Sequence, residues 1–284
     1  MSEYREHSVL CTSPAGLHRM AYTEWGDAGN PRVLVCVHGL TRVGHDFDDL
    51  ARALAGRYRV VCPDLVGRGN SDWLADPKYY APPQYTADMV TLIARLNVES
   101  VHWVGTSLGG IVGMALAALP KTPITRLVLN DVGPTLKAAA LKRIAEYVGK
   151  APKFETFEQA RAYIQAVSHS FGLKTEAQWK HLAQIAVKPD GDGYRMHYDP
   201  AIAVPFGGPD AVIEDVSLWP FYDAIKCPTL AVRGAHSDLL DRVTLEEMTR
   251  RGPRAQAVEI PEVGHAPMFM DEDQIAVVRD FLLQ

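Results

Sequence analysis

The chain has 284 residues, of which 47% are hydrophobic and 22% are charged. This composition is typical of globular proteins and excludes an intrinsically disordered or collagen-like chain. The 29 basic and 34 acidic residues give a net charge of −5, which is no electrostatic reason to expect nucleic acid, whose phosphates call for a basic face. The length suits one large α/β domain, or a core domain that carries an insertion.

The four cysteines lie far apart and form no CxxC pair, so the sequence predicts neither a zinc site nor a redox motif. Free buried thiols fit a reducing compartment. Residues 1–8 lack the basic and apolar segments of a signal peptide. The longest apolar stretch, residues 108–119, is shorter than the about 20 residues that cross a bilayer. We therefore expect a cytoplasmic protein with no membrane partner.

The first predicted elements are two extended segments, residues 6–11 and 18–24, which a Ser-Pro-Ala-Gly turn separates. We expect them to form an antiparallel hairpin. Continuous apolar runs then recur along the chain, and such runs are typical of strands that are buried on both faces of a parallel sheet. These runs are residues 33–37, 58–62, 101–105, 127–129, 229–232 and 257–260.

Helical patterns separate these runs, and the alternation of strand and helix predicts a doubly wound, mostly parallel α/β sheet. The predicted helices are residues 46–54, 86–96, 108–119, 244–251 and 271–283.

The alternation stops after residue 129 and resumes at residue 228. Between these points, residues 136–148, 157–171 and 176–187 have apolar residues at helical spacing, without recognisable buried strands. We interpret residues 134–220 as a helical insertion, the cap segment, in a core formed by residues 1–133 and 221–284. We expect the cap segment to lie above the carboxyl ends of the strands, where open α/β sheets bind ligands.

The sequence Gly105-Thr-Ser107-Leu-Gly109 fits the pattern GxSxG between an apolar strand and an apolar helix. This context places Ser107 on a tight turn at a helix N-terminus, where free amides favour developing negative charge. Ser107 is the predicted catalytic nucleophile. The alternative is a glycine-rich turn that only joins the strand to the helix.

His38-Gly39-Leu40 directly follows another buried strand. A backbone amide there can face the nucleophile across the sheet edge, so the amides of Leu40 and Leu108 form the predicted oxyanion hole. We interpret His38 itself as a structural histidine that bonds to the backbone.

His265 lies in a short glycine-containing loop after the last strand and is the predicted general base. Asp238, in the loop after the strand at residues 229–232, is the predicted acid that orients the imidazole. Asp131, which follows the strand at residues 127–129, is the alternative acid. The other interpretation of Asp131 is a carboxylate that fixes the entrance to the cap segment through local hydrogen bonds.

These motifs occur in the order Ser107, Asp238, His265. Together with the segment at residues 63–71, these motifs are similar to those of the α/β-hydrolase fold. The resemblance extends from near residue 18 to residue 284 and is to the branch of serine carboxylic-ester hydrolases. A serine at position 107 argues against epoxide hydrolases and haloalkane dehalogenases, which use an aspartate. Residues 67–73 and 129–134 are similar to those of bacterial hydrolases of short esters and hydroxyalkanoate oligomers.

Two residues outside the triad are candidates for substrate binding. Arg42 can clamp a substrate carboxylate near the reacting carbonyl, or it can form an ion pair with Asp46 or Asp49. Trp73 can line the pocket, or it can pack against neighbouring tyrosines on the surface. The aromatic residues of the cap segment are candidates for the wall of the cleft: Phe171, Trp179, Tyr194, His197 and Phe206.

We therefore expect a hydrolase without cofactor or metal that cleaves a small or medium carboxylic ester through an acyl-enzyme. The resemblance implies a 3-hydroxybutyrate-type oligomer as one substrate. The alternatives are a lactonase or carbon–carbon bond hydrolase, a cofactor-free perhydrolase or haloperoxidase, and a non-catalytic ligand receptor. Either a monomer or a homodimer fits the sequence.

Overall fold

The computed structural model describes residues 3–150, 152–207 and 212–284. Two residues of the N-terminal segment and five of the cap segment therefore lie outside the described residues. The chain opens with the predicted hairpin, in which β1 (Tyr4–Ser13) and β2 (Gly16–Trp25) pair antiparallel. β2 then pairs antiparallel with the strand that follows residue 58.

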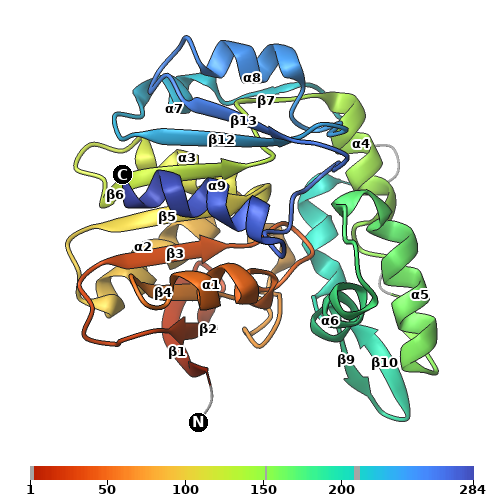
Figure 1. Ribbon diagram of the computed structural model, residues 1–284. Coiled ribbons are helices and arrows are strands. Elements are labelled where there is room, and N and C mark those ends of the chain that lie inside the picture. The colour runs from red at the N-terminus through yellow and green to blue at the C-terminus, as the bar shows by residue number, and fades with distance from the viewer. Residues whose placement is uncertain (1–2, 151, 208–211) are drawn as a thin grey trace.

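An eight-stranded sheet crosses the molecule in the order β1-β2-β4-β3-β5-β6-β12-β13 (Figure 1). The pairs from β4 to β13 are parallel, which confirms the predicted doubly wound sheet and its six strands, although β13 at the sheet edge is mostly exposed or half-buried. These strands are β3 (Val33–Val37), β4 (Arg59–Pro63), β5 (Val101–Thr106), β6 (Ile124–Asn130), β12 (Thr229–Gly234) and β13 (Gln256–Ile260).

Helices cover both faces of this sheet. α1 (Asp48–Leu54), after the short turn η1 (Gly44–Phe47), and α9 (Glu272–Leu283) pack on one face. The other face carries α2 (Pro82–Leu96), α3 (Leu108–Ala117) and α8 (Arg242–Met248), with η2 (Pro77–Tyr79) before α2.

Side chains along β3 alternate between these two layers. Val33 and Val35 belong to the core beneath α2 and α3, whereas Leu34 and Cys36 belong to the core beneath α1 and α9. Because both faces are buried, every position of such a strand favours an apolar residue.

The cap segment stands beside one end of the sheet, on the right of Figure 1. The three predicted helical segments are confirmed as α4 (Ala138–Tyr147), α5 (Phe157–Val167) with η3 (His169–Phe171), and α6 (Glu176–Ala186). The turn η4 (Pro200–Phe206) also lies in the cap segment, and α7 (Trp219–Ala224) begins at the end of this segment and continues into the core.

The cap segment also contains strands that the sequence did not predict. β8 (Lys153–Phe154), β10 (Gly193–Met196) and β9 (Val187–Asp190) form an antiparallel sheet, and β7 (Thr135–Leu136) pairs with β11 (Val216–Ser217). These strands have two to four residues and are mostly half-buried or exposed, so they lack the continuous apolar run that marks the central strands.

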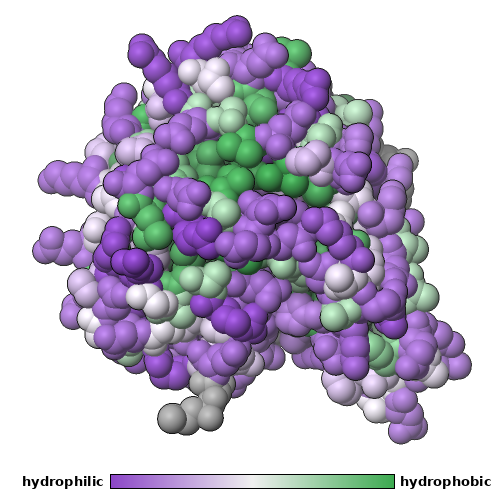
Figure 2. Space-filling view, in the orientation of Figure 1, coloured by the Kyte–Doolittle hydropathy of each residue, from purple (hydrophilic) through white to green (hydrophobic). Residues whose placement is uncertain are grey.

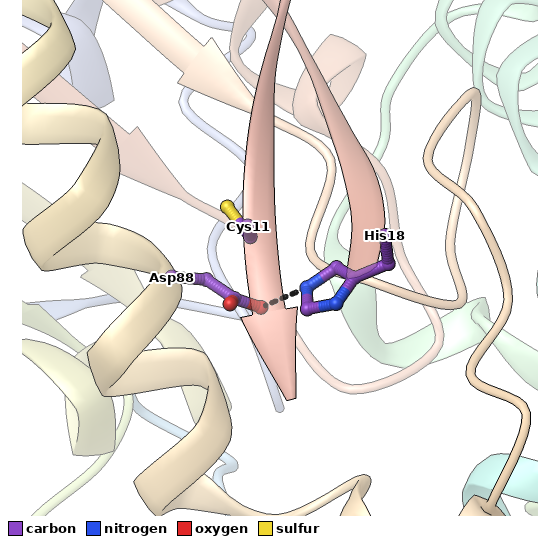
Figure 3. A group of neighbouring side chains, drawn as sticks. All are labelled: Cys11, His18 and Asp88. Atoms are coloured by element: carbon purple, nitrogen blue, oxygen red, sulfur yellow. Dashed lines mark hydrogen bonds and ion pairs between the residues drawn. The ribbon is translucent and has the colours of Figure 1, made fainter. Parts of the chain in front are cut away.

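The N-terminal hairpin is attached to α2 by a buried polar cluster (Figure 3). His18 Nε2 lies 3.0 Å from Asp88 Oδ2, and Gln84 Nε2 donates to Asp88 Oδ1 at 2.8 Å. Within the described ranges, Cys11, His18 and Asp88 are also the one group of side chains close enough to hold a metal ion. Burial, with the Asp88 charge, raises the pKa of the Cys11 thiol to about 12. The side chains hold one another by hydrogen bonds, and we interpret the cluster as a structural contact between the hairpin and α2.

Polar and charged side chains cover most of the face shown in Figure 2, and apolar side chains gather over β12 and β13. Within the described ranges, no helix combines the length and the apolar character that a membrane span requires.

Candidate active site

Ser107 occupies a sharp turn between β5 and α3, with φ 52° and ψ −113°. A Cβ atom on Gly105 would lie 2.3 Å from the carbonyl oxygen of Gly109, and one on Gly109 would lie 2.0 Å from that of Val37. Both positions therefore require glycine, which is the physical reason for the GxSxG spacing. The turn presents the Ser107 side chain at the end of β5, directly before the first turn of α3.

The structure brings His265 to Ser107. His265 Nε2 lies 3.1 Å from Ser107 Oγ, and His265 Nδ1 lies 2.7 Å from Asp131 Oδ2. An ionised carboxylate only accepts hydrogen bonds, so Nδ1 is the donor toward Asp131 and Nε2 is left as the acceptor for the Ser107 hydroxyl. The side chain of Asp131 is fully buried and that of His265 is 14% exposed.

The carboxylate beside His265 belongs to Asp131, and not to Asp238, the acid predicted from the sequence. Asp131 comes directly after β6, the neighbour of β5, which places it close to Ser107 and His265. Asp238 lies farther along the loop after β12, where its half-exposed side chain pairs with Arg143 of α4. The prediction that Asp238 contacts His265 is therefore wrong.

The loop after β12 donates hydrogen bonds to Asp131 instead of placing a carboxylate beside His265. Its Gly234 amide donates to Asp131 Oδ1 at 2.8 Å, and the Ser237 hydroxyl donates to Asp131 Oδ2 at 2.7 Å. With His265, these donors fix both carboxylate oxygens. Sequence reasoning missed Ser237, although its position beside Asp238 in the same loop was a usable signal.

Asn130 is a second residue that sequence reasoning missed. Its fully buried side-chain amide donates to Thr106 Oγ1 at 2.9 Å and to the carbonyl oxygen of Pro267 at 2.8 Å. One side chain thereby joins the end of β5, just before Ser107, to the loop that carries His265. A polar residue at the end of an apolar strand was the available signal.

His38 has the structural role that its sequence context predicts. Its side chain is fully buried, Nε2 accepts from the Leu65 amide at 2.9 Å, and Nδ1 lies 2.7 Å from the carbonyl oxygen of Gly39. Burial is the main reason that the pKa of His38 falls to about 3. The imidazole is therefore neutral, and because Nε2 accepts, Nδ1 carries the hydrogen and donates to Gly39.

The two residues of the predicted oxyanion hole lie on either side of Ser107. Leu108 is the first residue of α3 and follows Ser107 in the chain. Leu40 lines the same cavity as Ser107, and its carbonyl oxygen accepts a 2.8 Å hydrogen bond from Arg68 Nε. The fully buried Arg68 guanidinium thus holds the segment that carries Leu40.

A cavity of about 110 Å³ lies over Ser107 and His265, between the ends of the strands and the cap segment. Arg42 and Arg143 contribute to its wall. Phe171 is the one residue of the five proposed aromatic candidates that lines it among the described residues. The tyrosines of the cap segment that line it were not predicted: Tyr147, Tyr163 and Tyr198.

Trp73 does not lie in the described wall of this cavity. Its side chain is 45% exposed, and the Arg195 guanidinium lies 5.0 Å from the ring centroid. Its predicted place in the pocket is therefore wrong, because the loop after Gly69 turns this side chain toward the surface and β10.

Arg42 forms the ion pair that was the alternative to substrate binding. Its Nε and Nη2 donate to the two oxygens of Asp46 at 2.9 and 2.6 Å, and its guanidinium lies 5.9 Å from the Phe171 ring centroid. The side chain nevertheless lines the cavity.

A second cavity of about 390 Å³ shares Leu40 with the first and includes Leu108 in its wall. Most of its other lining residues are apolar, among them Ile111, Leu136 and Phe206. Of the two residues expected to form the oxyanion hole, Leu40 therefore lies at the border of the two cavities and Leu108 lines the second.

Comparisons with known proteins agree with this architecture. The family described as "alpha/beta hydrolase fold" matches residues 32–272. The chain is 56% identical over 280 residues to a 3-hydroxybutyrate-oligomer hydrolase of Cupriavidus necator, a match that covers 96% of each chain.

Two solved structures are similar over nearly their full length. A putative hydrolase from Rickettsia typhi has a TM-score of 0.92 and 33% identity over 99% of both chains. An alpha/beta hydrolase from Novosphingobium aromaticivorans has a TM-score of 0.88 and 38% identity, and the match covers 100% of this chain and 99% of that one. The chain therefore belongs to the alpha/beta hydrolase fold family.

Proposed function

We propose that this chain is a serine hydrolase of carboxylic esters and that short 3-hydroxybutyrate oligomers are its substrates. The observation that carries the chemistry is the continuous chain of hydrogen bonds from Ser107 through His265 to the buried Asp131. The observation that supports the substrate is the 56% identity, over 96% of both chains, to a 3-hydroxybutyrate-oligomer hydrolase.

In the first half of the reaction, His265 Nε2 accepts the Ser107 proton while Ser107 Oγ attacks the ester carbonyl. Asp131 holds the opposite ring nitrogen and stabilises the imidazolium that forms. His265 then gives its proton to the oxygen of the leaving alcohol as the carbon–oxygen bond breaks. The acyl group remains on Ser107.

In the second half, His265 accepts a proton from a water molecule that attacks the acyl-enzyme. The tetrahedral intermediate collapses, Ser107 Oγ takes the proton back from His265, and the carboxylic acid leaves. In both halves we assign the oxyanion to the amides of Leu40 and Leu108. Each such donor typically contributes about 3 kcal/mol to the stabilisation of the transition state.

We also propose that residues 134–220 act as a cap over the catalytic residues. Support comes from the cavity wall, to which the core gives Ser107 and His265 and the cap segment gives Arg143, Tyr147 and Phe171. A space of about 110 Å³ accommodates a small acyl or alcohol group, and the adjoining apolar cavity can take further repeats of a short aliphatic oligomer.

Covalent labelling and substrate profiling test this function. We expect a fluorophosphonate to label the wild-type protein at Ser107 and to leave Ser107→Ala unlabelled. We expect linear 3-hydroxybutyrate dimers and trimers to be cleaved with a higher kcat/KM than p-nitrophenyl butyrate. Labelling without cleavage of any ester would point to a receptor. Preferred cleavage of lactones or carbon–carbon bonds, or peroxide-dependent halogenation, would replace the ester assignment.

We further propose a cytoplasmic location and a monomeric or homodimeric state. The location is supported by the four cysteines, which are all free thiols in the structure. Fractionation of cells and size-exclusion chromatography of the purified protein test the two statements.

A further inference from the structure

Two arginines, Arg42 and Arg143, line the cavity above Ser107, and each is paired with an aspartate. Arg42 comes from the loop after β3, beside the nucleophile: a Cβ on Gly39 would lie 3.6 Å from Arg42 Cγ and 3.7 Å from Ser107 Cβ. Arg143 comes from α4 in the cap segment. A guanidinium group in the wall of such a cavity can bind a substrate carboxylate through two parallel hydrogen bonds.

The Arg42 guanidinium is held by a partner that the substrate cannot easily displace. Asp46 binds it through both carboxylate oxygens, and the side chains of Arg42 and Asp46 are only 12% and 8% exposed. Removing Arg42 from this pair would leave Asp46 as a buried charge without its counterion, which is costly. The Arg42 guanidinium therefore stays paired with Asp46 and does not bind a substrate carboxylate.

The Arg143 guanidinium, unlike that of Arg42, belongs to an exposed ion pair. Its partner Asp238 lies in the loop after β12, and the side chains of Arg143 and Asp238 are 42% and 50% exposed. An ion pair this exposed is weak because water competes for both groups. Asp238 lies outside the described wall of the cavity, so it can return to solvent when another carboxylate binds Arg143.

Tyr147 lies beside Arg143 in the cavity wall and adds a neutral donor. Burial raises the pKa of the Tyr147 hydroxyl, and the nearby Arg143 opposes that shift only in part. A hydroxyl that keeps its proton next to a guanidinium is suited to bind a carboxylate oxygen.

We infer that Arg143 is the specificity-determining residue that binds the free carboxylate of the substrate, exchanging Asp238 for it. This inference rests on the proposed ester hydrolysis. It assigns to Arg143 the role that the sequence suggested for Arg42, and it restricts the preferred substrates to hydroxyacyl oligomers whose terminal carboxylate is free.

The test compares two substrates that differ only in that charge: the linear 3-hydroxybutyrate dimer and the same dimer capped as a primary amide. The kcat/KM for ester cleavage is measured for both by mass spectrometry. We expect wild type to prefer the free acid, and we expect Arg143→Gln to reduce this preference by roughly 10- to 100-fold, the scale of a charge-assisted hydrogen bond.

Two further variants test whether Arg143 acts by binding the substrate carboxylate or only by joining the cap segment to the core through its ion pair with Asp238. Asp238→Asn breaks the same ion pair but keeps Arg143, so we expect its preference for the free acid to be equal to or higher than that of wild type. Arg161→Gln removes another arginine of the cap segment, one that pairs with Glu176 and does not line the cavity, so the preference should stay unchanged.

The inference is overturned if Arg143→Gln keeps the wild-type preference, or if Asp238→Asn loses it to the same extent. Equal cleavage of both dimers by wild type overturns the inference and leaves the ester hydrolase function intact. If wild type cleaves neither dimer, the proposed substrate itself is wrong.

Discussion

Asp131 and Asp238 have the same side chain in very different surroundings. Asp131 is fully buried and accepts hydrogen bonds from His265, Ser237 and the Gly234 amide. A buried carboxylate with these fixed donors holds one orientation, which an acid that orients a histidine requires. Asp238 is half exposed and pairs with the half-exposed Arg143 of α4, so its position depends on the cap segment.

We expect Asp131→Asn to lower kcat for p-nitrophenyl butyrate by roughly 10⁴-fold, because the amide no longer holds the imidazole in the productive tautomer. Asp238→Asn should change kcat for this uncharged ester by less than about tenfold. Steady-state kinetics of both variants, with their melting temperatures as a folding control, check the assignment. A larger loss for Asp238→Asn would restore Asp238 as the acid.

His38 gives a pH-dependent contribution to stability. Its pKa is lowered from 6.5 to about 3, chiefly by burial, so between these values the unfolded chain binds a proton that the folded chain does not. Falling pH therefore destabilises the fold through this residue. The stabilisation is complete above pH 6.5 and is lost progressively toward pH 3.

We expect His38→Gln to be less stable than wild type at pH 7, and the difference to shrink by about 1.4 kcal/mol per pH unit between pH 6 and pH 4. Urea denaturation at several pH values measures it. Groups that titrate alike in both proteins cancel in the difference. A difference in stability that does not change between pH 6 and pH 4 would show that His38 binds its proton in the folded chain as readily as in the unfolded chain.

Sequence reasoning located Ser107 and His265 because their loops have strong local signals, a glycine-flanked serine after a strand and a glycine-flanked histidine after another. The acid was harder to identify because Asp131 and Asp238 follow two neighbouring parallel strands, β6 and β12, whose carboxyl ends lie at the same edge of the sheet. Only the path of the loop after β12 decides between them. That path depends on Ser237 and Gly234, whose hydrogen bonds to Asp131 join positions about a hundred residues apart in the chain.

The N-terminus of α6 links the cap segment to the core. The Thr175 hydroxyl accepts from the Gln178 amide at 3.2 Å, and Gln178 Oε1 accepts from the Thr175 amide at 3.0 Å, which completes a capping box. The Gln178 side chain also donates to Asp271, directly before α9, at 2.9 Å. One glutamine therefore stabilises a helix terminus and a contact between the two parts of the molecule.

We expect Thr175→Ala to lower the free energy of unfolding by about 1 kcal/mol, the usual contribution of such a cap. Thr91→Ala is the matched control, because Thr91 is a half-buried residue inside α2 whose hydroxyl bonds to the Ala87 carbonyl within the same helix. Chemical denaturation of both variants gives the comparison. Equal effects would mean that the capping box contributes nothing.

A buried hydrogen bond joins the cap segment to the loop before α2. The Tyr80 hydroxyl donates to Asp199 Oδ2 at 2.7 Å and accepts from the Leu74 amide at 2.8 Å. The backbones meet at the same place, where the Asp199 amide donates to the Gly67 carbonyl at 2.7 Å. This contact holds the cap segment in place beside the cavity.

We expect Tyr80→Phe to lower the free energy of unfolding by about 1–3 kcal/mol, because it leaves a buried carboxylate oxygen and a buried amide without their partner. Tyr79→Phe, at a partly exposed position, should change it by less than about 0.5 kcal/mol. Urea denaturation measures both. Equal stability of Tyr80→Phe and wild type would show that water replaces the hydroxyl.

The sequence predicted the central sheet almost strand for strand because its inner strands are buried on both sides, and this burial leaves a continuous apolar run. β3, for example, has the predicted bounds, Val33–Val37. The cap segment was predicted only as helices. Its strand β10 is mostly half-buried and pairs with β8, nearly forty residues earlier, so its extended form depends on contacts that a local pattern does not contain.

The hydrogen bond from His38 to Gly39 also affects the neighbouring residue. The Gly39 carbonyl and the Leu40 N–H are the two ends of one peptide group. His38 Nδ1 lies 2.7 Å from this carbonyl oxygen, and the Arg42 amide donates to it at 3.2 Å. Hydrogen bonds to the oxygen polarise the amide and make its N–H a stronger donor. A histidine behind the loop thus strengthens the proposed oxyanion donor, and because it stays neutral it does so equally across the physiological pH range.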